Sequence, residues 1–367
     1  MDIDKQALVD SAARHFDVSG VYRGAIPYGS GHINDTYKAV YEGPERQIHV
    51  ILQRINHQIF RDPVALMNNI QRVTAHVAAQ VKMEPDSARR SLTLIPAQDG
   101  QAWHLDAHGN YWRAYYFIPN ARTYDTVESA KQAYEAARTF GKFQKYLASL
   151  PAPRLHDTIP DFHNTPRRLR ALKDATRADA VGRAGIATAE IAFVDAREGM
   201  ASALLDAGLP ERVTHNDTKI NNVMMDEVSG EGLCVIDLDT VMPGLAPYDF
   251  GDLVRTATSH AQEDELDLSK VSMQLPMYEA LLRGYLSTAG EFLTWEEKQC
   301  LALAGKLITF EIGVRFLTDY LAGDLYFKVH RPGQNLDRCR TQFRLVESIE
   351  QQEERMQDLL WSIEQHP

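Results

Sequence analysis

Several features are scarce in this sequence, and each absence argues against a class of protein. Three cysteines occur in 367 residues, Cys234, Cys300 and Cys339, and none belongs to a Cys-x-x-Cys pair. This small, odd number argues against a disulfide framework and favours a reducing, cytoplasmic compartment. No uncharged apolar run reaches about 18 residues, so we expect no membrane-spanning helix. The first five residues are acidic overall and lack the apolar core of a signal peptide.

The sequence also lacks a basic excess. Lys and Arg together number 39 against 50 Asp and Glu, which gives a net charge of −11. A chain without surplus cations gains little from counterion release, so neither nucleic acid nor an anionic membrane is an expected partner. The acidic surface is compatible with a monomer, which we expect. At 367 residues the chain exceeds one typical domain, which favours two lobes.

The residue patterns that are present predict different structures in the two parts of the chain. Residues 20–118 contain apolar and aromatic strand-like segments and one principal helix, which the N-cap residue Asp62 and Pro63 begin. From Val127 onward helical spacing dominates, and a capping box at Thr294 and Glu297 opens a single helix that runs to about Leu321. We therefore predict an α+β chain. Its small β-rich N-lobe spans residues 1–118 and its large helical C-lobe spans residues 119–367.

The most informative segment reads His215-Asn-Asp217-Thr-Lys-Ile-Asn-Asn222, followed by Ile236-Asp237-Leu-Asp239. Phosphoryl transfer needs an acceptor hydroxyl held in line and a cation that neutralises the phosphates. Asp217 can accept the hydroxyl proton, while Asn222 and Asp237 offer the hard oxygen ligands that Mg²⁺ prefers. The spacing therefore predicts Asp217 as a catalytic base and the other two as metal ligands.

A short hairpin separates the two halves of this motif. Apolar segments 223–225 and 233–236 flank the turn residues 226–232. If Met225 pairs with Cys234, Asn222 faces Asp237 at the open end of the hairpin. A slip of one residue would turn every side chain to the other face.

A glycine segment, Tyr28-Gly29-Ser30-Gly31-His32, lies between two strand-like segments. Glycines that flank a serine let backbone N–H groups approach phosphate oxygens closely. We therefore assign Gly29, Ser30 and Gly31 to nucleotide binding. No Gly-Lys-Ser/Thr follows, which argues against a Walker A loop.

Together these segments resemble the aminoglycoside phosphotransferase and choline kinase branch of the protein-kinase-like fold. The longer strings, including Tyr248-Asp-Phe-Gly-Asp252, are similar to the bacterial N-acetylhexosamine 1-kinases. The resemblance covers about Gly29 to Arg338. It implies a two-lobed kinase-like fold, ATP as co-substrate and Mg²⁺ as cofactor. It also implies transfer of a phosphoryl group to the anomeric hydroxyl of a sugar.

The resemblance further implies which residues hold the sugar: His32, Asp217, Arg315 and Tyr326. Arg315 belongs to an otherwise apolar helix, where a guanidinium is costly without a polar partner. An ion pair of Arg315 with Glu311 or Asp319 is the structural alternative. The resemblance gives His215 a structural role in fixing the catalytic loop.

The sequence departs from the protein-kinase pattern where a strand lysine is expected. Gln53-Arg54 occupies that place, and we assign Arg54 to the phosphates, although strand alternation allows only one of the two to face them. The helix that follows offers Asn68 and Asn69 where kinases place a glutamate. Lys219 either reaches the phosphoryl group or is solvated.

Two further aspartates are assigned supporting roles. Asp239 either helps a second metal or points away from the first, and we favour support of the site. Asp249-Phe-Gly251 spells the kinase metal motif, but Asp237 already fills that role. We therefore expect Asp249 or Asp252 to cap a helix or brace the catalytic loop.

Three other interpretations remain open. A kinase of the same fold could act on another sugar, an amino alcohol or an aminoglycoside, since the hairpin does not select the acceptor. A two-metal hydrolase would normally recruit several His ligands, and only His215 is near the motif. A non-catalytic protein of kinase fold would bind nucleotide without turnover.

Overall fold

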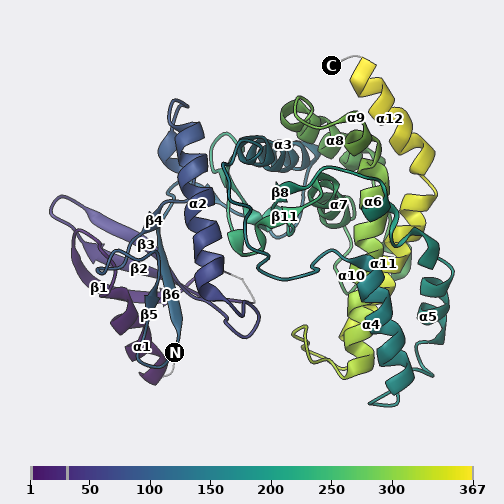
Figure 1. The fold of residues 1–367 in the computed structure, drawn as a ribbon, viewed down its shortest axis with the longest axis horizontal. Helices are drawn as coiled ribbons and strands as arrows, with labels where there is room; N and C mark the ends of the chain where they lie inside the picture. Colours follow the sequence, from purple (N-terminus) through teal and green to yellow (C-terminus); the bar gives the residue numbers. More distant parts are fainter. Residues whose placement is uncertain (1–2, 30–32, 366–367) are drawn as a thin grey trace. The chain divides into compact units, whose positions relative to one another are not determined.

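The computed structural model describes residues 3–29 and 33–365, which form two compact units (Figure 1). The N-terminal unit comprises Met1–Ala121, Ser149–Ile159 and Leu233–Met242. The C-terminal unit comprises Arg122–Ala148, Pro160–Gly232 and Pro243–Pro367. The first unit thus takes in two later segments, which a single boundary after residue 118 does not include.

An antiparallel sheet forms the centre of the N-terminal unit, in the order β1-β2-β3-β6-β4, with β5 paired to β6. Its strands are β1 (Val21–Pro27), β2 (Asp35–Glu42), β3 (Gln47–Arg54), β4 (Leu94–Ile95), β5 (His104–Leu105) and β6 (Tyr111–Tyr116). Helix α1 (Ile3–Ala13) buries Val9 and Ala12 in a core with Leu52 and Trp112. Because side chains alternate along a strand, Thr36, Gln53 and Arg113, which are paired across the sheet, belong to the opposite face.

Helix α2 (Pro63–Val81) begins as predicted, since the Asp62 side chain accepts a hydrogen bond from the Ala65 N–H at 2.9 Å. Its Asn69 is fully buried and ties the later segments of this unit to the helix. The Asn69 amide nitrogen donates to the carbonyls of His156 (2.8 Å) and Val241 (3.2 Å), and its oxygen accepts from the His156 N–H at 2.9 Å. Asn69, one of the two asparagines found where kinases place a glutamate, therefore has a structural role.

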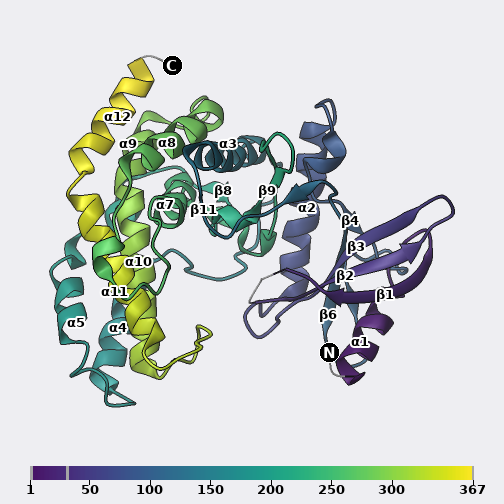
Figure 2. The same cartoon turned by 180° about the vertical axis from the view of Figure 1, so that it is seen from behind.

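The C-terminal unit is mainly helical. Its longest helix, α10, packs against α4, α7 and α11, while α3 lies along α8 (Figure 2). The helices are α3 (Ala130–Leu147), α4 (Thr165–Ala178), α5 (Thr188–Asp195), α6 (Ala203–Asp206), α7 (Ala246–Ala257), α8 (Leu275–Ala289), α9 (Trp295–Gln299), α10 (Leu301–Ala322), α11 (Gln334–Glu350) and α12 (Glu353–Gln365). The remaining strands of the chain are β7 (Ala121–Arg122), β8 (Arg212–Thr214), β9 (Val223–Asp226), β10 (Gly232–Val235) and β11 (Met242–Gly244).

The capping box at Thr294 and Glu297 is confirmed, but the single helix predicted after it is wrong. The Cys300 N–H is shared between the carbonyls of Glu296 and Glu297, and α10 starts only after this irregular residue. Among residues 3–29 and 33–365, no helix is long and apolar enough to cross a membrane.

Candidate active site

The loop that contains Asp217 is clamped through its backbone by one buried carboxylate. The N–H groups of His215 and Asn216 donate to the two carboxylate oxygens of Asp249, at 2.9 and 2.7 Å. The Thr218 hydroxyl donates to the Asp249 carbonyl at 2.5 Å. Asn216 adopts a left-handed conformation with φ of 66°, so the clamp stabilises a turn that the chain would otherwise disfavour.

Asp249 lies in the first turn of α7 and is fully buried. The Gln144 amide also donates to it at 2.5 Å. Burial raises the pKa of Asp249, and the electrostatic interaction with His215 and the hydrogen bonds from these donors offset that rise only in part. Gly251 has a packing role, because a Cβ there would lie 2.5 Å from the Ala304 carbonyl of α10. In this sequence, therefore, Asp-Phe-Gly braces the loop and packs two helices.

His215 and Asp252 lie on either side of this clamp in the sequence. The His215 ring is buried against Phe140 and Phe143, with ring centroids 5.3 and 6.1 Å away. Its Nδ1 accepts a hydrogen bond from the Asp217 N–H at 3.3 Å, which agrees with a structural role. Asp252 instead accepts from the Arg255 Nε at 2.7 Å, one turn along α7.

Asp217, Lys219 and Asn222 lie together at the end of the loop. The Lys219 ammonium is 2.8 Å from the Asp217 carboxylate. Burial opposes ionisation of Asp217, but the charge and hydrogen bond of Lys219 outweigh it and lower its pKa. The Asn222 amide nitrogen donates to the Asp217 carbonyl at 2.8 Å, which leaves the amide oxygen as the atom suited to a cation.

The hairpin after Asn222 closes two residues away from the pairing assumed from the sequence. The Asp226 N–H donates to the Glu231 carbonyl at 2.8 Å, whereas the assumed pairing puts Leu233 opposite Asp226. A shift of two residues keeps each side chain on its face. Strand β9 begins directly after Asn222, and Asp237 follows β10 in a left-handed conformation with φ of 59°.

In the N-terminal unit, Asp239 belongs to a buried polar network that the sequence did not indicate. Its carboxylate pairs with the Arg113 guanidinium and accepts from the Asn34 amide at 2.5 Å. The Arg113 Nε donates to Gln53 at 2.9 Å, and Gln53 in turn donates to Thr36. Because both oxygens of Asp239 are engaged, the network favours a supporting role over metal binding.

The assignment of Arg54 to the phosphates does not agree with the structure. Arg54 belongs to the sheet face that α1 covers, where it pairs with Asp35 at 2.5 Å and its side chain is 38% exposed. Gln53 belongs to the opposite face with Arg113. Of the glycine segment, Gly29 has φ of 80°, and Ser30, Gly31 and His32 lie outside the described residues.

Arg315 and Tyr326, the predicted sugar ligands, belong to one aromatic cluster. The Arg315 guanidinium carbon lies 5.2, 5.9 and 5.6 Å from the ring centroids of Phe162, Tyr326 and Phe327. Cation–π contacts of this kind hold the guanidinium in place. The Tyr326 side chain remains 55% exposed.

Neither predicted carboxylate partner pairs with Arg315. Glu311 bonds to His163 and Thr165, and Asp319 accepts the N–H groups of Leu325, Tyr326 and Phe327 at 2.8–2.9 Å. Within the part of the chain that the structure describes, Arg315 has no ion pair. Asp319 thus fixes the segment that contains Tyr326, and Arg315 acts on the nearby Glu311 only through its charge, which lowers the pKa of that carboxyl group.

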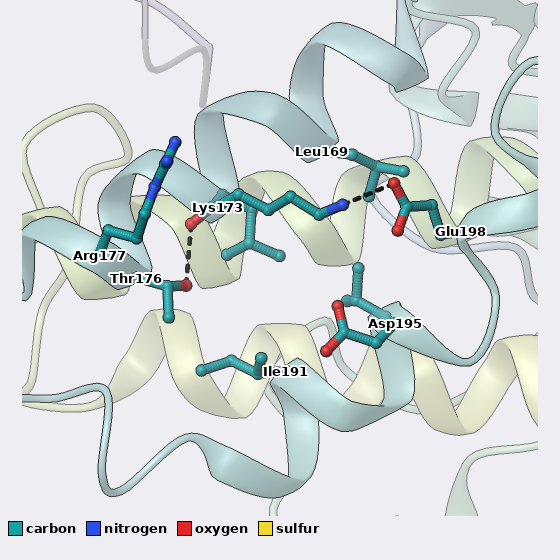
Figure 3. Close-up of a pocket in the computed structure, with 9 residues that line it drawn as sticks. Leu169, Lys173, Thr176, Arg177, Ile191, Asp195 and Glu198 are labelled. Carbon is teal, nitrogen blue, oxygen red and sulfur yellow. Dashed lines mark hydrogen bonds and ion pairs between the residues drawn. The ribbon is translucent and has the colours of Figure 1, made fainter.

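A separate pocket lies between α4 and α5 (Figure 3). Leu169, Leu172, Ile191 and Val194 give it an apolar floor, and an ion pair between Lys173 and Glu198 (2.6 Å) crosses its rim. It contains none of the predicted site residues.

The whole fold is similar to solved phosphotransferase structures. A microcompartment-associated aminopropanol kinase is 16% identical over 96% of this chain and 98% of its own, with a TM-score of 0.56. Spectinomycin phosphotransferase in complex with ADP and spectinomycin is 15% identical over 95% and 98%, with a TM-score of 0.52. Plasmodium vivax ethanolamine kinase is 13% identical over 87% and 81%, with a TM-score of 0.51. These likenesses confirm the two-lobed protein-kinase-like fold.

A sequence profile provides a closer assignment than these distant structures. The profile described as the phosphotransferase enzyme family matches residues 24–286, which include the glycine segment, the loop of Asp217 and the hairpin that follows. The match covers clearly more than half of the chain. The chain therefore belongs to the phosphotransferase enzyme family.

Proposed function

We propose that this protein transfers the γ-phosphoryl group of ATP to the anomeric hydroxyl of an N-acetylhexosamine, giving a sugar 1-phosphate and ADP. Membership of the phosphotransferase family supports the reaction class. The ADP bound to the similar spectinomycin phosphotransferase supports a purine nucleotide as donor. The backbone of Gly29, Ser30 and Gly31 would contact the phosphates.

Asp217 is the proposed base. Its lowered pKa keeps it ionised at neutral pH, so it can accept the hydrogen bond of the sugar hydroxyl and orient the oxygen. As the new O–P bond forms and the bond to the leaving ADP oxygen breaks, the hydroxyl proton passes to Asp217. Lys219, 2.8 Å away, balances the carboxylate until that proton arrives.

Asn222 and Asp237 are the proposed magnesium ligands. The amide oxygen of Asn222 and the carboxylate of Asp237 are hard donors, which fit Mg²⁺. Among the residues that the structure describes, no group of three or more His, Cys, Asp or Glu side chains is arranged to hold a metal. This fits a site in which phosphate and water oxygens supply the other ligands. When bound, the metal would offset negative charge on the phosphates.

The setting of Arg315 is the observation that carries the choice of acceptor. A guanidinium without a carboxylate partner, beside an exposed Tyr326, suits an uncharged sugar that offers oxygen acceptors and a flat apolar face. A cationic amino alcohol or aminoglycoside would meet repulsion from the same charge. His32 completes the proposed sugar contacts. The alternative is a kinase of the same fold for another small hydroxyl compound.

The test is ADP release from Mg-ATP with GlcNAc, GalNAc, glucose, galactose, mannose, choline, an aminoglycoside or no acceptor. We expect turnover with N-acetylhexosamines, an approximately 10²- to 10⁴-fold lower kcat in Asp217→Asn, and a raised sugar KM in Arg315→Ala. Arg177→Ala, an exposed arginine of α4, is the matched control. Turnover with choline or an aminoglycoside alone would overturn the acceptor, and ADP release independent of any acceptor would overturn the kinase.

A further inference from the structure

A buried bridge joins the catalytic loop to helix α10. The His163 ring contacts the Asn216 carbonyl through Nε2 (3.1 Å) and the Glu311 carboxylate through Nδ1 (2.9 Å). The Thr165 hydroxyl donates to the other Glu311 oxygen at 2.6 Å. Glu311 is fully buried and His163 nearly so, although neither belongs to the motif around Asp217.

The hydrogen-bond partners of His163 constrain where the protons of this bridge lie. A carbonyl oxygen only accepts, so His163 Nε2 carries a hydrogen that it donates to Asn216. The contact between Nδ1 and Glu311 then needs one more proton, on the ring or on the carboxyl group. Burial alone would raise the pKa of Glu311, but the charge of His163, the bonds from His163 and Thr165, and the charge of Arg315 lower it. With that proton on either group, the His163 ring forms one hydrogen bond to Asn216 and one to Glu311.

The same bridge touches the proposed acceptor site. Arg315 follows Glu311 by four residues on α10, so both side chains belong to one helix face. Phe162, directly before His163, lies against the Arg315 guanidinium at 5.2 Å. The short segment 162–165 therefore contacts the arginine proposed to bind the sugar and the residue that precedes Asp217.

We propose that His163 and Glu311 are positioning residues that align Asp217 with the acceptor held at Arg315. This inference rests on the proposed function in that Asp217 is taken as the base. The bridge holds the Asn216 carbonyl from one side while Asp249 holds the Asn216 N–H from the other. Loss of the bridge would free the peptide next to Asp217, and a displacement of about 1 Å is enough to lower turnover strongly.

Glu311→Gln and Glu311→Ala separate positioning from charge. A glutamine amide can donate to Nδ1 of a neutral His163, which still donates from Nε2 to Asn216, and its oxygen can accept from Thr165. We expect Glu311→Gln to keep at least about a third of kcat, and Glu311→Ala to lose about 10- to 100-fold. KM for ATP should change by less than about twofold, because the bridge belongs to the acceptor side.

Thr165→Val is the second variant if Glu311→Ala does not fold, and it should lower kcat by a smaller factor. Glu297→Gln, which alters another fully buried carboxylate, is the control for stability alone and should leave kcat unchanged. ¹⁵N-histidine NMR should show His163 protonated on Nε2, the nitrogen that donates to the Asn216 carbonyl, in the wild type and in Glu311→Gln.

Three results would overturn the inference: unchanged kcat in folded Glu311→Ala or, failing that, in Thr165→Val; equal losses in Glu311→Gln and Glu311→Ala; or a wild-type His163 whose Nε2 carries no proton and so cannot donate to Asn216. A wild-type protein without kinase activity would instead refute the proposed function. The NMR result does not depend on that activity, so the two failures are distinguishable.

Discussion

Two buried aspartates in this protein are compensated by opposite means. Asp239, in the N-terminal unit, meets the guanidinium of Arg113. Asp249, in the C-terminal unit, accepts its hydrogen bonds from neutral donors, namely two backbone N–H groups and the Gln144 amide. The first carboxylate fixes a contact between side chains, whereas the second fixes the path of the backbone beside Asp217.

The two solutions have different electrostatic consequences. Asp239 raises the pKa of Arg113 despite burial of the guanidinium, so the guanidinium stays charged. The pKa of Asp249 is instead raised by burial, so its ionised form costs stability at neutral pH. That cost is relieved as the pH falls through the folded-state pKa. An ion pair can be exchanged for an apolar pair, but no substitution can remove the backbone donors that Asp249 serves.

The largest loss of stability should come from breaking the ion pair between Arg113 and Asp239. Asp239→Leu leaves Arg113 buried without a carboxylate and should lower the free energy of unfolding by about 3–5 kcal/mol. The double variant Asp239→Leu/Arg113→Met should recover most of that loss. Urea denaturation measures both. A double variant as unstable as the single one would show that the network cannot be replaced by packing.

Asp249→Asn should lower the free energy of unfolding by less than Asp239→Leu does, but no second substitution should restore the loss. An asparagine amide offers one acceptor oxygen in place of two, so one backbone N–H of the loop loses its partner, at about 1–3 kcal/mol. We expect a fall in Tm together with a fall in kcat, because the clamped residues adjoin Asp217. Thermal denaturation and ADP release check this. An unchanged kcat at a lower Tm would separate the clamp from catalysis.

Lys219→Met tests a third form of charge compensation, the ion pair between Lys219 and Asp217 in the candidate active site. Without the ammonium, the pKa of Asp217 should rise, so the acid limb of kcat/KM should move to higher pH. In the wild type this pair contributes stability above the unfolded-state pKa of about 3.9, and the contribution is lost as the pH falls through the lower folded-state pKa. Lys173→Met, on another ion pair, should leave the limb in place. An unmoved limb in Lys219→Met would exclude this coupling.

The smallest effect should come from Arg54→Ala. Its pair with Asp35 is partly exposed, so the loss of stability should stay below about 1 kcal/mol. Because Arg54 belongs to the face that α1 covers, KM for ATP should change by less than about twofold. A tenfold rise in that KM would place Arg54 at the phosphates after all.

Local signals allowed part of this architecture to be predicted. Asp62 with Pro63 and the capping box at Thr294 act over a few residues, and both start helices as expected. The loop of Asp217 was singled out because its candidate catalytic and metal-binding residues are close in sequence. The fold class followed from that motif and the change from strand to helix patterns.

Long-range partners could not be predicted in the same way. Arg113 and Asp239 are 126 residues apart, and His163 and Glu311 are 148 apart. Nothing local distinguishes such a residue from a solvated one. The choice between Gln53 and Arg54 needed the identity of the covered sheet face, which depends on where α1 packs.

The buried Asn69 of α2 has a consequence for how this protein can be divided. Its amide donates hydrogen bonds to the carbonyls of His156 and Val241. Both residues belong to the N-terminal unit but come from distant parts of the sequence. A fragment that ends at Ala121 would expose this amide without its partners. Exchange of the N-terminal unit with that of a relative would therefore require three separate grafts, whereas Arg315 lies in the C-terminal unit and could be substituted without any of them.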